Sequence, residues 1–251
     1  MQFHQKFKNV SVAVGEERVV AIPQLLHQLP QTEVIILDDA FQHRQVMAGL
    51  NIILTDYSNL YTRDFILPAG DLRDVRSSSK RAQIIIVTKC NPALTVIEKE
   101  KIITEIAPSS DQAVYFTTIV YDFPFHLFTK ETINITADYG VLLVCGIANP
   151  APLKAHLAQQ VDSYDMLRYP DHHIFHSNDL NDIKQQFKKI KADKKIVLTT
   201  EKDAVRLEKF RDELQDFPVY VVPVRHEFMF NEANKFADIV TGFVKTFKKY
   251  D

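Results

Sequence analysis

Short apolar runs that alternate with helical stretches set the strongest limit on how this chain can fold. Each run holds three or four consecutive apolar residues, which suits a strand buried on both faces of a sheet. The six clearest runs are residues 34–37, 52–54, 84–87, 141–144, 196–198 and 219–222. Helical patterns fall between several of them, at residues 98–106, 152–160 and 180–190. This alternation predicts an α/β protein built on parallel sheets.

One region breaks the alternation and divides the chain into lobes. Residues 114–136 read as extended chain around Phe123, Pro124 and Phe125, and we expect a β-ribbon there. The sequence predicts a first lobe at residues 1–115, a ribbon linker at 116–137, a second, smaller α/β lobe at 138–228 and a C-terminal helix at 229–251. That helix places apolar side chains on one face, so we expect it to pack against a lobe.

Composition excludes several classes of protein. The 251 residues are 46% hydrophobic and carry a formal net charge of −2, so the chain can build cores and has no basic excess for nucleic acid. No apolar stretch approaches the roughly 20 residues of a membrane-spanning helix, and the first ten residues do not form a signal peptide. The two cysteines, Cys90 and Cys145, are expected to be reduced thiols in a cytosolic protein.

Two consecutive acids, Asp38 and Asp39, directly follow the first apolar run. Parallel sheets bind ligands beyond the carboxyl ends of their strands, so these acids are expected at a ligand site. Such a pair can form a Walker B element, in which one carboxylate holds Mg²⁺ and the other orients water or a base. Adjacent acids also cap helices or face solvent, and the two residues alone do not distinguish these roles from a Walker B element.

A Pro- and Gly-containing loop carries two arginines, Arg73 and Arg76, after Asp71. The guanidinium group matches phosphate oxygens in a two-pronged geometry, so these side chains are candidates for phosphate contacts. Ion pairing with Asp71 and Asp74 is the alternative.

An acid and three histidines lie close together at Asp171, His172, His173 and His176. An imidazole paired with a carboxylate can act as a general base or orient one, and the same residue types bind metals. A polar loop whose histidines face water is the third interpretation. Further along, Thr199 or Thr200 could cap a helix that has Asp203 in its first turn, and a role toward substrate or the other lobe stays open.

Six segments together resemble one protein family. The chain contains DDAFQHR (residues 38–44), LPAGDLRD (67–74), VTKCNP (87–92), CGIANP (145–150), YPDHHIF (169–175) and TTEKDAV (199–205). This is the order and approximate spacing of the tetraacyldisaccharide 4'-kinases.

The resemblance implies a P-loop-type parallel sheet lobe and ATP-dependent phosphorylation of the 4'-hydroxyl of tetraacyldisaccharide 1-phosphate, forming lipid IVA in lipid A biosynthesis. ATP and Mg²⁺ are the implied cofactors, and the implied place is the cytoplasmic face of the bacterial inner membrane. The implied partners are the lipid disaccharide and that membrane surface, with no nucleic acid and no known protein partner.

The resemblance also assigns roles to residues. Asp38 and Asp39 would be the Walker B acids at the Mg²⁺ site, with Asp39 also catalytic, and Gln42 and His43 would belong to the same nucleotide-site signature. Arg73 would contact phosphate or substrate. The catalytic segment would be Asp171, His172 and His173, and we favour His172 over His173 as the partner of a catalytic aspartate.

One family feature has no counterpart in this sequence. The family carries a Gly-rich loop ending in Gly-Lys-Thr or Gly-Lys-Ser, followed by a Gly-Asp-Glu-Pro segment. The chain has six glycines and no such loop, so we expect a sequence that starts downstream of it and an incomplete first lobe. Because P-loop catalysis depends on backbone amides and a lysine around the phosphates, we expect the isolated chain to be inactive.

Two other functions are considered. A metal-dependent phosphoesterase would also use an Asp-His-His segment, but that class needs an Asp-x-Asp arrangement, which the sequence does not contain. A non-catalytic fragment that binds the lipid disaccharide is the second alternative.

Overall fold

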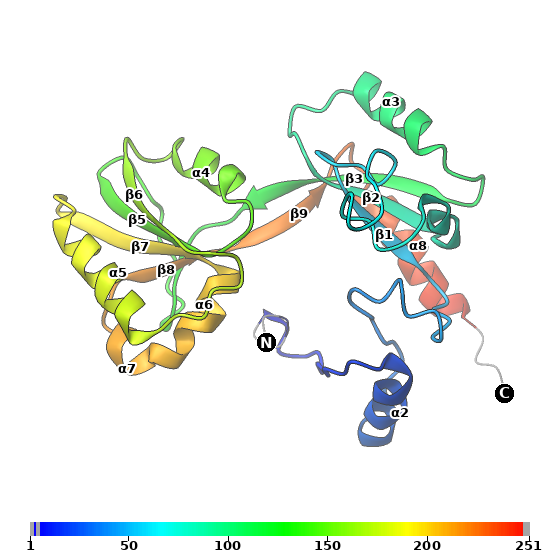
Figure 1. Cartoon of the computed structure of the whole chain (residues 1–251), viewed down its shortest axis with the longest axis horizontal. Coiled ribbons are helices and arrows are strands. Elements are labelled where there is room, and N and C mark those ends of the chain that lie inside the picture. The colour runs from blue at the N-terminus through cyan, green and yellow to red at the C-terminus, as the bar shows by residue number, and fades with distance from the viewer. Residues whose placement is uncertain (1–2, 4–5, 248–251) are drawn as a thin grey trace. The chain divides into compact units, whose positions relative to one another are not determined.

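The computed structural model describes residue 3 and residues 6–247. The chain divides into two compact units, which are named here after their characteristic motifs. The DHH unit, named for Asp171, His172 and His173, comprises residues 1–11 and 121–225. The DD unit, named for Asp38 and Asp39, comprises residues 12–120 and 226–251. Each unit contains one β-sheet with helices on both faces, so the expected α/β class is confirmed (Figure 1).

The sheet of the DHH unit has five strands in the order β4-β8-β7-β5-β6. The strands are β4 (Phe125–His126), β5 (Tyr139–Cys145), β6 (Tyr164–Arg168), β7 (Lys194–Thr200) and β8 (Val219–Val222). Strands β6, β5, β7 and β8 are parallel, and only the short edge strand β4 runs antiparallel. The carboxyl ends of β5, β6 and β7 therefore meet at one edge of the sheet, where a ligand site is expected.

Helices cover both faces of this sheet because successive strand residues point to opposite sides. Val141, Leu143 and Cys145 of β5 pack with α4 (Ala151–Leu157), whereas Leu142 and Val144 face the other core. That second core is completed by α5 (Ser177–Lys189), α6 (Glu201–Leu207) and α7 (Arg211–Leu214), with the short 3₁₀ turn η2 (Glu208–Phe210) between the last two. Burial on both faces explains why the sequence shows continuous apolar runs here.

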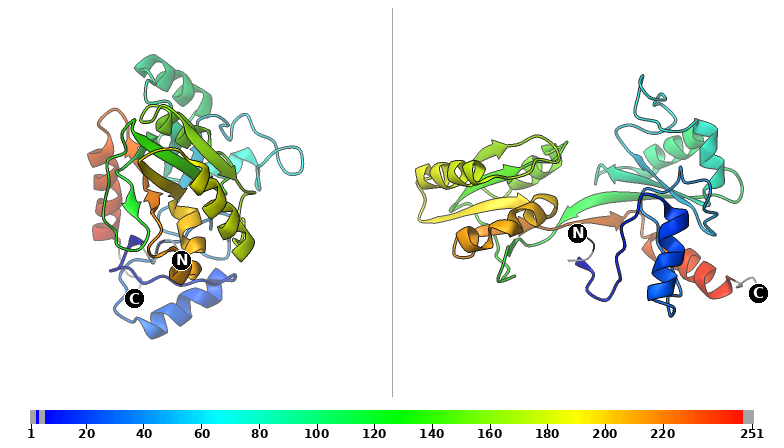
Figure 2. Two further views of the ribbon diagram at one scale, coloured as in Figure 1. Left: turned by 90° about the vertical axis from the view of Figure 1, so that its left-hand side faces the viewer. Right: turned by 60° about the horizontal axis from the view of Figure 1, so that its bottom comes forward.

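The sheet of the DD unit has four strands in the order β1-β2-β3-β9. The strands are β1 (Ile52–Asp56), β2 (Ile84–Cys90), β3 (Ala113–Tyr121) and β9 (Val224–Phe228), with β1, β2 and β3 parallel. Helix α3 (Val96–Ile106) packs against Ile85, Val87 and Phe116. Helix α8 (Ala233–Thr246) packs against Ile84, Ile86 and Tyr115 on the other face (Figure 2).

The expectation that residues 34–37 form a buried strand is wrong. The segment is irregular, and the side chains of Val34 and Ile36 are 49% and 90% exposed. A strand needs a neighbour to satisfy its backbone groups, and no described strand pairs with this segment. It follows α2 (Arg18–Gln28) as irregular chain, so Asp38 and Asp39 lie on a loop and not at a strand end.

The region expected to be a ribbon contains β3 and β4, which belong to different sheets. The C-terminal helix uses Phe236 and Val240 to contact its core, and the end of the predicted helix at residues 248–251 lies outside the described residues. Both cysteines are buried and unpaired, and burial raises their thiol pKa values, that of Cys90 to about 11. Within the described part of the chain, no helix combines the length and apolar character that a membrane crossing requires.

Candidate functional site

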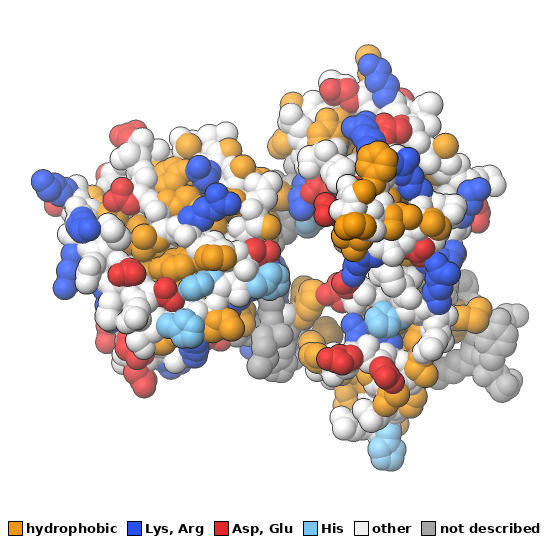
Figure 3. All heavy atoms as spheres, in the orientation of Figure 1, with side chains coloured by type: hydrophobic (Ala, Val, Ile, Leu, Met, Phe, Trp, Pro, Cys, Tyr) orange, Lys and Arg blue, Asp and Glu red, His pale blue; other side chains and the backbone are white. Residues whose placement is uncertain are grey.

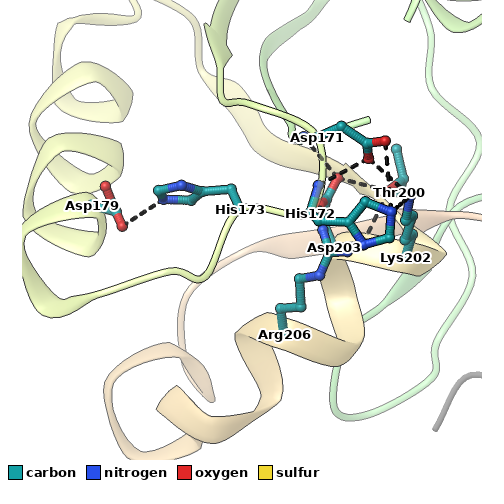
Figure 4. A network of polar contacts seen from close by, with 9 residues as sticks. Asp171, His172, His173, Asp179, Thr200, Lys202, Asp203 and Arg206 are labelled. Atoms are coloured by element: carbon teal, nitrogen blue, oxygen red, sulfur yellow. Dashed lines mark hydrogen bonds and ion pairs between the residues drawn. The ribbon is translucent and has the colours of Figure 1, made fainter. Parts of the chain in front are cut away.

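Three of the sequence motifs converge at the carboxyl edge of the DHH sheet. Gly146 follows β5, Pro170 follows β6, and Thr200 ends β7. A methyl group added at Gly146 would lie 3.1 Å from Asp203 Oδ1, 3.2 Å from the Pro170 carbonyl oxygen and 3.5 Å from His173 Cβ. The CGIANP, YPDHHIF and TTEKDAV segments therefore pack directly on one another, and the polar groups that they bring together are drawn in Figure 4.

The centre of this site is Asp203, a carboxylate with no exposed surface. Its Oδ2 accepts hydrogen bonds from the Gly146 backbone N–H at 2.9 Å and the Thr200 hydroxyl at 2.8 Å. Its Oδ1 accepts a charge-assisted bond from Arg206 at 3.0 Å. A buried carboxylate is tolerated only when it is paired with a cation and hydrogen-bonded. Arg206 supplies the cation, and all three donors supply hydrogen bonds. Thr200 also caps α6 by accepting from the Asp203 N–H at 3.2 Å.

His172 projects from this framework into solvent, with 73% of its side chain exposed. Its Nδ1 lies 3.3 Å from a guanidinium nitrogen of Arg206, and its Nε2 lies 3.2 Å from Lys202 Nζ. The backbone of His172 is left-handed, with φ of 61°. For a residue other than glycine this conformation costs about 1–2 kcal/mol, and such strain is concentrated at functional sites.

Asp171 joins the same network through Lys202, which donates to its Oδ1 at 2.9 Å. The backbone N–H of His172 donates to the same oxygen at 2.9 Å. The Lys202 hydrogen bond is the main reason that the pKa of Asp171 is lowered, despite some desolvation that raises it. Asp171 is thus a carboxylate that holds Lys202 beside the His172 ring.

His173 is placed differently from its neighbour. Its ring stacks on Tyr169 with centroids 4.6 Å apart, and its Nε2 lies 2.9 Å from Asp179 Oδ2. Asp179 also accepts from the backbone N–H of His176 at the start of α5. Burial raises the pKa of Asp179, but the bonds from His173 and His176 outweigh it, so the net pKa is lowered. His173 therefore ties the loop to α5, whereas the ring of His172 is open to solvent.

The second candidate site lies in the DD unit and is built from two crossed ion pairs. Arg73 of the LPAGDLRD segment pairs with Asp39 of DDAFQHR. Arg44 of DDAFQHR pairs in turn with Asp74 of LPAGDLRD at 2.9 Å. The Arg73 hydrogen bond is the largest cause of the lowered pKa of Asp39, and the Arg44 bond lowers the pKa of Asp74 to about 2. Each motif thus supplies one acid and one arginine to the other.

The remaining predicted residues of the DD site lie on the same loop. Asp38 and Gln42 are exposed, and His43 is partly buried in a turn whose backbone N–H bonds to the Ala40 carbonyl at 2.9 Å. Arg73 forms its ion pair with Asp39 and not with its sequence neighbours Asp71 and Asp74, the alternative partners. At the ends of β1 and β2, Lys89 donates to Asp56 at 2.7 Å. Burial raises the pKa of Asp56, but the bonds from Lys89 and Ser58 leave it lowered.

The predicted metal ligands fit one mode of Mg²⁺ binding. Asp38 and Asp39 offer carboxylate oxygens, and Mg²⁺ is commonly held by one or two carboxylates together with substrate phosphates. No cluster of three or more histidine, cysteine or acidic side chains suited to a metal occurs among residues 3 and 6–247. The donor set is therefore compatible with a metal that arrives with a nucleotide, and it is not a closed cage for a permanently bound ion.

The residues that sequence reasoning missed are Arg206 and Asp179, which fix the two adjacent histidines. The spacing of Thr200, Asp203 and Arg206 at three-residue intervals gave a signal, because residues three apart share a helix face. Nothing in the sequence shows that this face meets the His172 loop.

Comparison with known proteins links the chain to a known class of protein. The family model described as tetraacyldisaccharide-1-P 4'-kinase matches residues 1–245. A tetraacyldisaccharide 4'-kinase from Bacteroides thetaiotaomicron is 39% identical over 259 residues, covering 97% of this chain and 68% of the relative. The corresponding protein from Flavobacterium psychrophilum is 40% identical over 248 residues, covering 98% of this chain and 69% of the relative.

A solved structure shares the fold. The crystal structure of LpxK from Aquifex aeolicus, described as an "apo" form in complex with ATP, aligns with a TM-score of 0.63 at 21% identity. The alignment covers 92% of this chain and 64% of that one. The chain thus spans about two thirds of the length of the proteins that it matches.

The α/β fold and the family-model match together define a phosphotransferase of the kinase class. Within that class, the chain belongs to the tetraacyldisaccharide-1-P 4'-kinase family, and the resemblance seen in the six motifs is confirmed. The Aquifex aeolicus structure is described as a complex with ATP, the nucleotide that the motifs implied, and Mg²⁺ stays a prediction.

Proposed function

We propose that this chain carries the acceptor-side catalytic residues of a kinase that transfers the γ-phosphate of ATP to the 4'-hydroxyl of tetraacyldisaccharide 1-phosphate, forming lipid IVA. The family match over residues 1–245 is the observation that carries this proposal. In the reaction the 4'-oxygen forms a bond to the γ-phosphorus, the bond to the β-phosphate oxygen breaks, and ADP leaves. The hydroxyl proton passes to a base.

In this proposal the DD site binds Mg²⁺ and phosphate, and the DHH site assists proton removal. Asp38 and Asp39 would hold Mg²⁺, which neutralises charge on the nucleotide phosphates. Arg73 would exchange its partner Asp39 for a phosphate oxygen, because its guanidinium is exposed and held by a surface ion pair of little net strength. His172 would assist removal of the hydroxyl proton, because it is the solvent-exposed imidazole of the DHH unit's network, whereas His173 is held by Asp179.

The place of action follows from the substrate. A tetraacylated disaccharide resides in a membrane, so we propose that the reaction occurs at the cytoplasmic face of the inner membrane. The large exposed hydrophobic side chains of the DD unit, which include Leu54, Phe65, Ile66 and Leu67, are available for contact with lipid or with further protein. Figure 3 shows such side chains at the molecular surface.

Activity is proposed to require a phosphate-binding loop that these 251 residues do not contain. Backbone amides and a lysine cradle the β- and γ-phosphates in P-loop enzymes, where catalysis depends on positioning and stabilising the transferred phosphate. We expect a polypeptide of these residues alone to bind ATP weakly and to transfer no phosphate.

The test compares this polypeptide with a chimaera that adds the part of the Bacteroides thetaiotaomicron relative outside the match, where we expect the P-loop. Transfer of labelled γ-phosphate to tetraacyldisaccharide 1-phosphate is expected only from the chimaera. Turnover by the 251-residue polypeptide would refute the need for the loop. A folded chimaera that binds ATP and leaves the lipid unphosphorylated would refute the kinase assignment.

A further inference from the structure

We propose that Arg206, anchored by the buried Asp203, is a positioning residue that fixes the ring of His172. The inference rests on the proposed function, in which His172 handles a proton of the acceptor hydroxyl. It adds a residue of the TTEKDAV helix to the machinery of the DHH loop. The contact that carries it is the 3.3 Å approach of Arg206 Nη2 to His172 Nδ1.

The anchoring of Arg206 supplies the first step of the argument. One guanidinium nitrogen, Nη1, bonds to Asp203 at 3.0 Å, and the other, Nη2, reaches His172. Asp203 cannot move with it, because the Gly146 N–H and the Thr200 hydroxyl hold its other oxygen at the ends of two sheet strands. A planar guanidinium with one nitrogen fixed presents its other N–H groups in a fixed direction. Through Arg206 and Asp203, the His172 ring is therefore held in a fixed position relative to the sheet.

The second step compares the two cations that flank the ring. Lys202 approaches Nε2 at 3.2 Å, but its side chain is 37% exposed and its partner Asp171 is 34% exposed. Arg206 is 20% exposed and its partner has no exposed surface. An exposed ion pair fixes geometry poorly because both side chains keep their freedom. Arg206 is thus the stiffer of the two contacts.

The third step concerns the ring atoms. An Arg206 N–H can only donate, so the bonded His172 Nδ1 must be the nitrogen that carries no proton. The neutral ring would then carry its proton on Nε2, which is 3.7 Å from the Asp171 carboxylate. Lys202 Nζ, which also can only donate, lies 3.2 Å from the same Nε2 and favours the opposite tautomer, with the proton on Nδ1. Arg206 and Lys202 therefore compete for the ring, and we expect removal of Arg206 to shift it toward the Nδ1–H form.

The experiment measures the ring ¹⁵N signals of His172 and His173 in the 251-residue chain by NMR. Arg206→Met removes the donor, and we expect about a two- to tenfold change in the His172 tautomer ratio, the effect of one ordinary hydrogen bond. The His173 ring, held by Asp179, serves as an internal control and should keep its signals. Arg211→Met, which removes an arginine that lies over the Phe128 ring, is the matched control and should change neither histidine.

A second variant keeps the test decisive if Arg206→Met fails to fold. Arg206→Lys preserves a cation for Asp203, but one ammonium group cannot fork to both Asp203 and His172, so the His172 signals should still move. Unchanged His172 signals in a folded Arg206 variant would overturn the proposal, as would equal changes at His172 and His173. Changed His172 signals beside a fully active His172→Ala chimaera would uphold the positioning and overturn the kinase role of the histidine instead.

Discussion

The two candidate sites differ in what holds them in place. The DHH site begins at strand ends and centres on Asp203, which is fully buried with three donors. The DD site lies on loops, and its two ion pairs, Arg73 with Asp39 and Arg44 with Asp74, join exposed arginines. The first site is therefore built into its fold, whereas the second is held by solvent-exposed ion pairs, which we propose a nucleotide or metal ion can replace at little cost.

The largest expected contrast is in stability. Asp203→Ala leaves the Gly146 N–H, the Thr200 hydroxyl and the Arg206 cation without their buried partner, and should cost about 3–5 kcal/mol. Asp39→Ala removes a carboxylate with 64% of its side chain exposed and should change stability by no more than about 1 kcal/mol. Urea unfolding followed by amide NMR signals in each unit measures both. Equal losses of stability in the two variants would contradict the claim that the DHH site is built into its fold and the DD site is not.

A smaller contrast is expected between two glycines. Alanine at Gly146 would place its methyl group 3.1 Å from Asp203 Oδ1 and 3.2 Å from the Pro170 carbonyl, and should cost roughly 1–2 kcal/mol. Alanine at Gly242 meets nothing within 4 Å and lies inside α8, where it should stabilise by about 0.5–1 kcal/mol. Opposite shifts in the unfolding midpoints of the two units would confirm that the DHH edge is tightly packed. A neutral Gly146→Ala would show that this edge is loose.

The smallest effect concerns the surface electrostatics of the DD site. The Arg44 hydrogen bond is the largest cause that lowers the pKa of Asp74 from its ordinary 3.8 to about 2. A folded pKa below the unfolded one means that the ion pair stabilises above about pH 4 and that this contribution disappears as pH falls through about 2. Carboxyl ¹³C titration should show the low pKa, and Arg44→Met or added salt should raise it. A pKa near 3.8 in the unmodified chain would contradict the pairing.

The sequence predicted the sheets better than the sites. Five of the six apolar runs are strands, because the runs at β1, β2, β5, β7 and β8 have neighbours that satisfy their backbone groups. Residues 34–37 have the same composition but no described strand beside them, and composition alone cannot reveal that difference. The acids and histidines were found from their spacing. The contacts of Arg206 with His172 and of Arg73 with Asp39 join distant segments, so only the fold brings them together.

The proposed division of labour between His172 and His173 is tested most directly by kcat in the P-loop-completed chimaera. His172→Ala should lower kcat by about 10²–10⁴-fold with little change in stability, because the ring is exposed and handles the proton. His173→Ala should lower stability instead, because it removes the stacking on Tyr169 and the bond to Asp179. A His172→Ala chimaera that keeps the kcat of the parent would contradict the account.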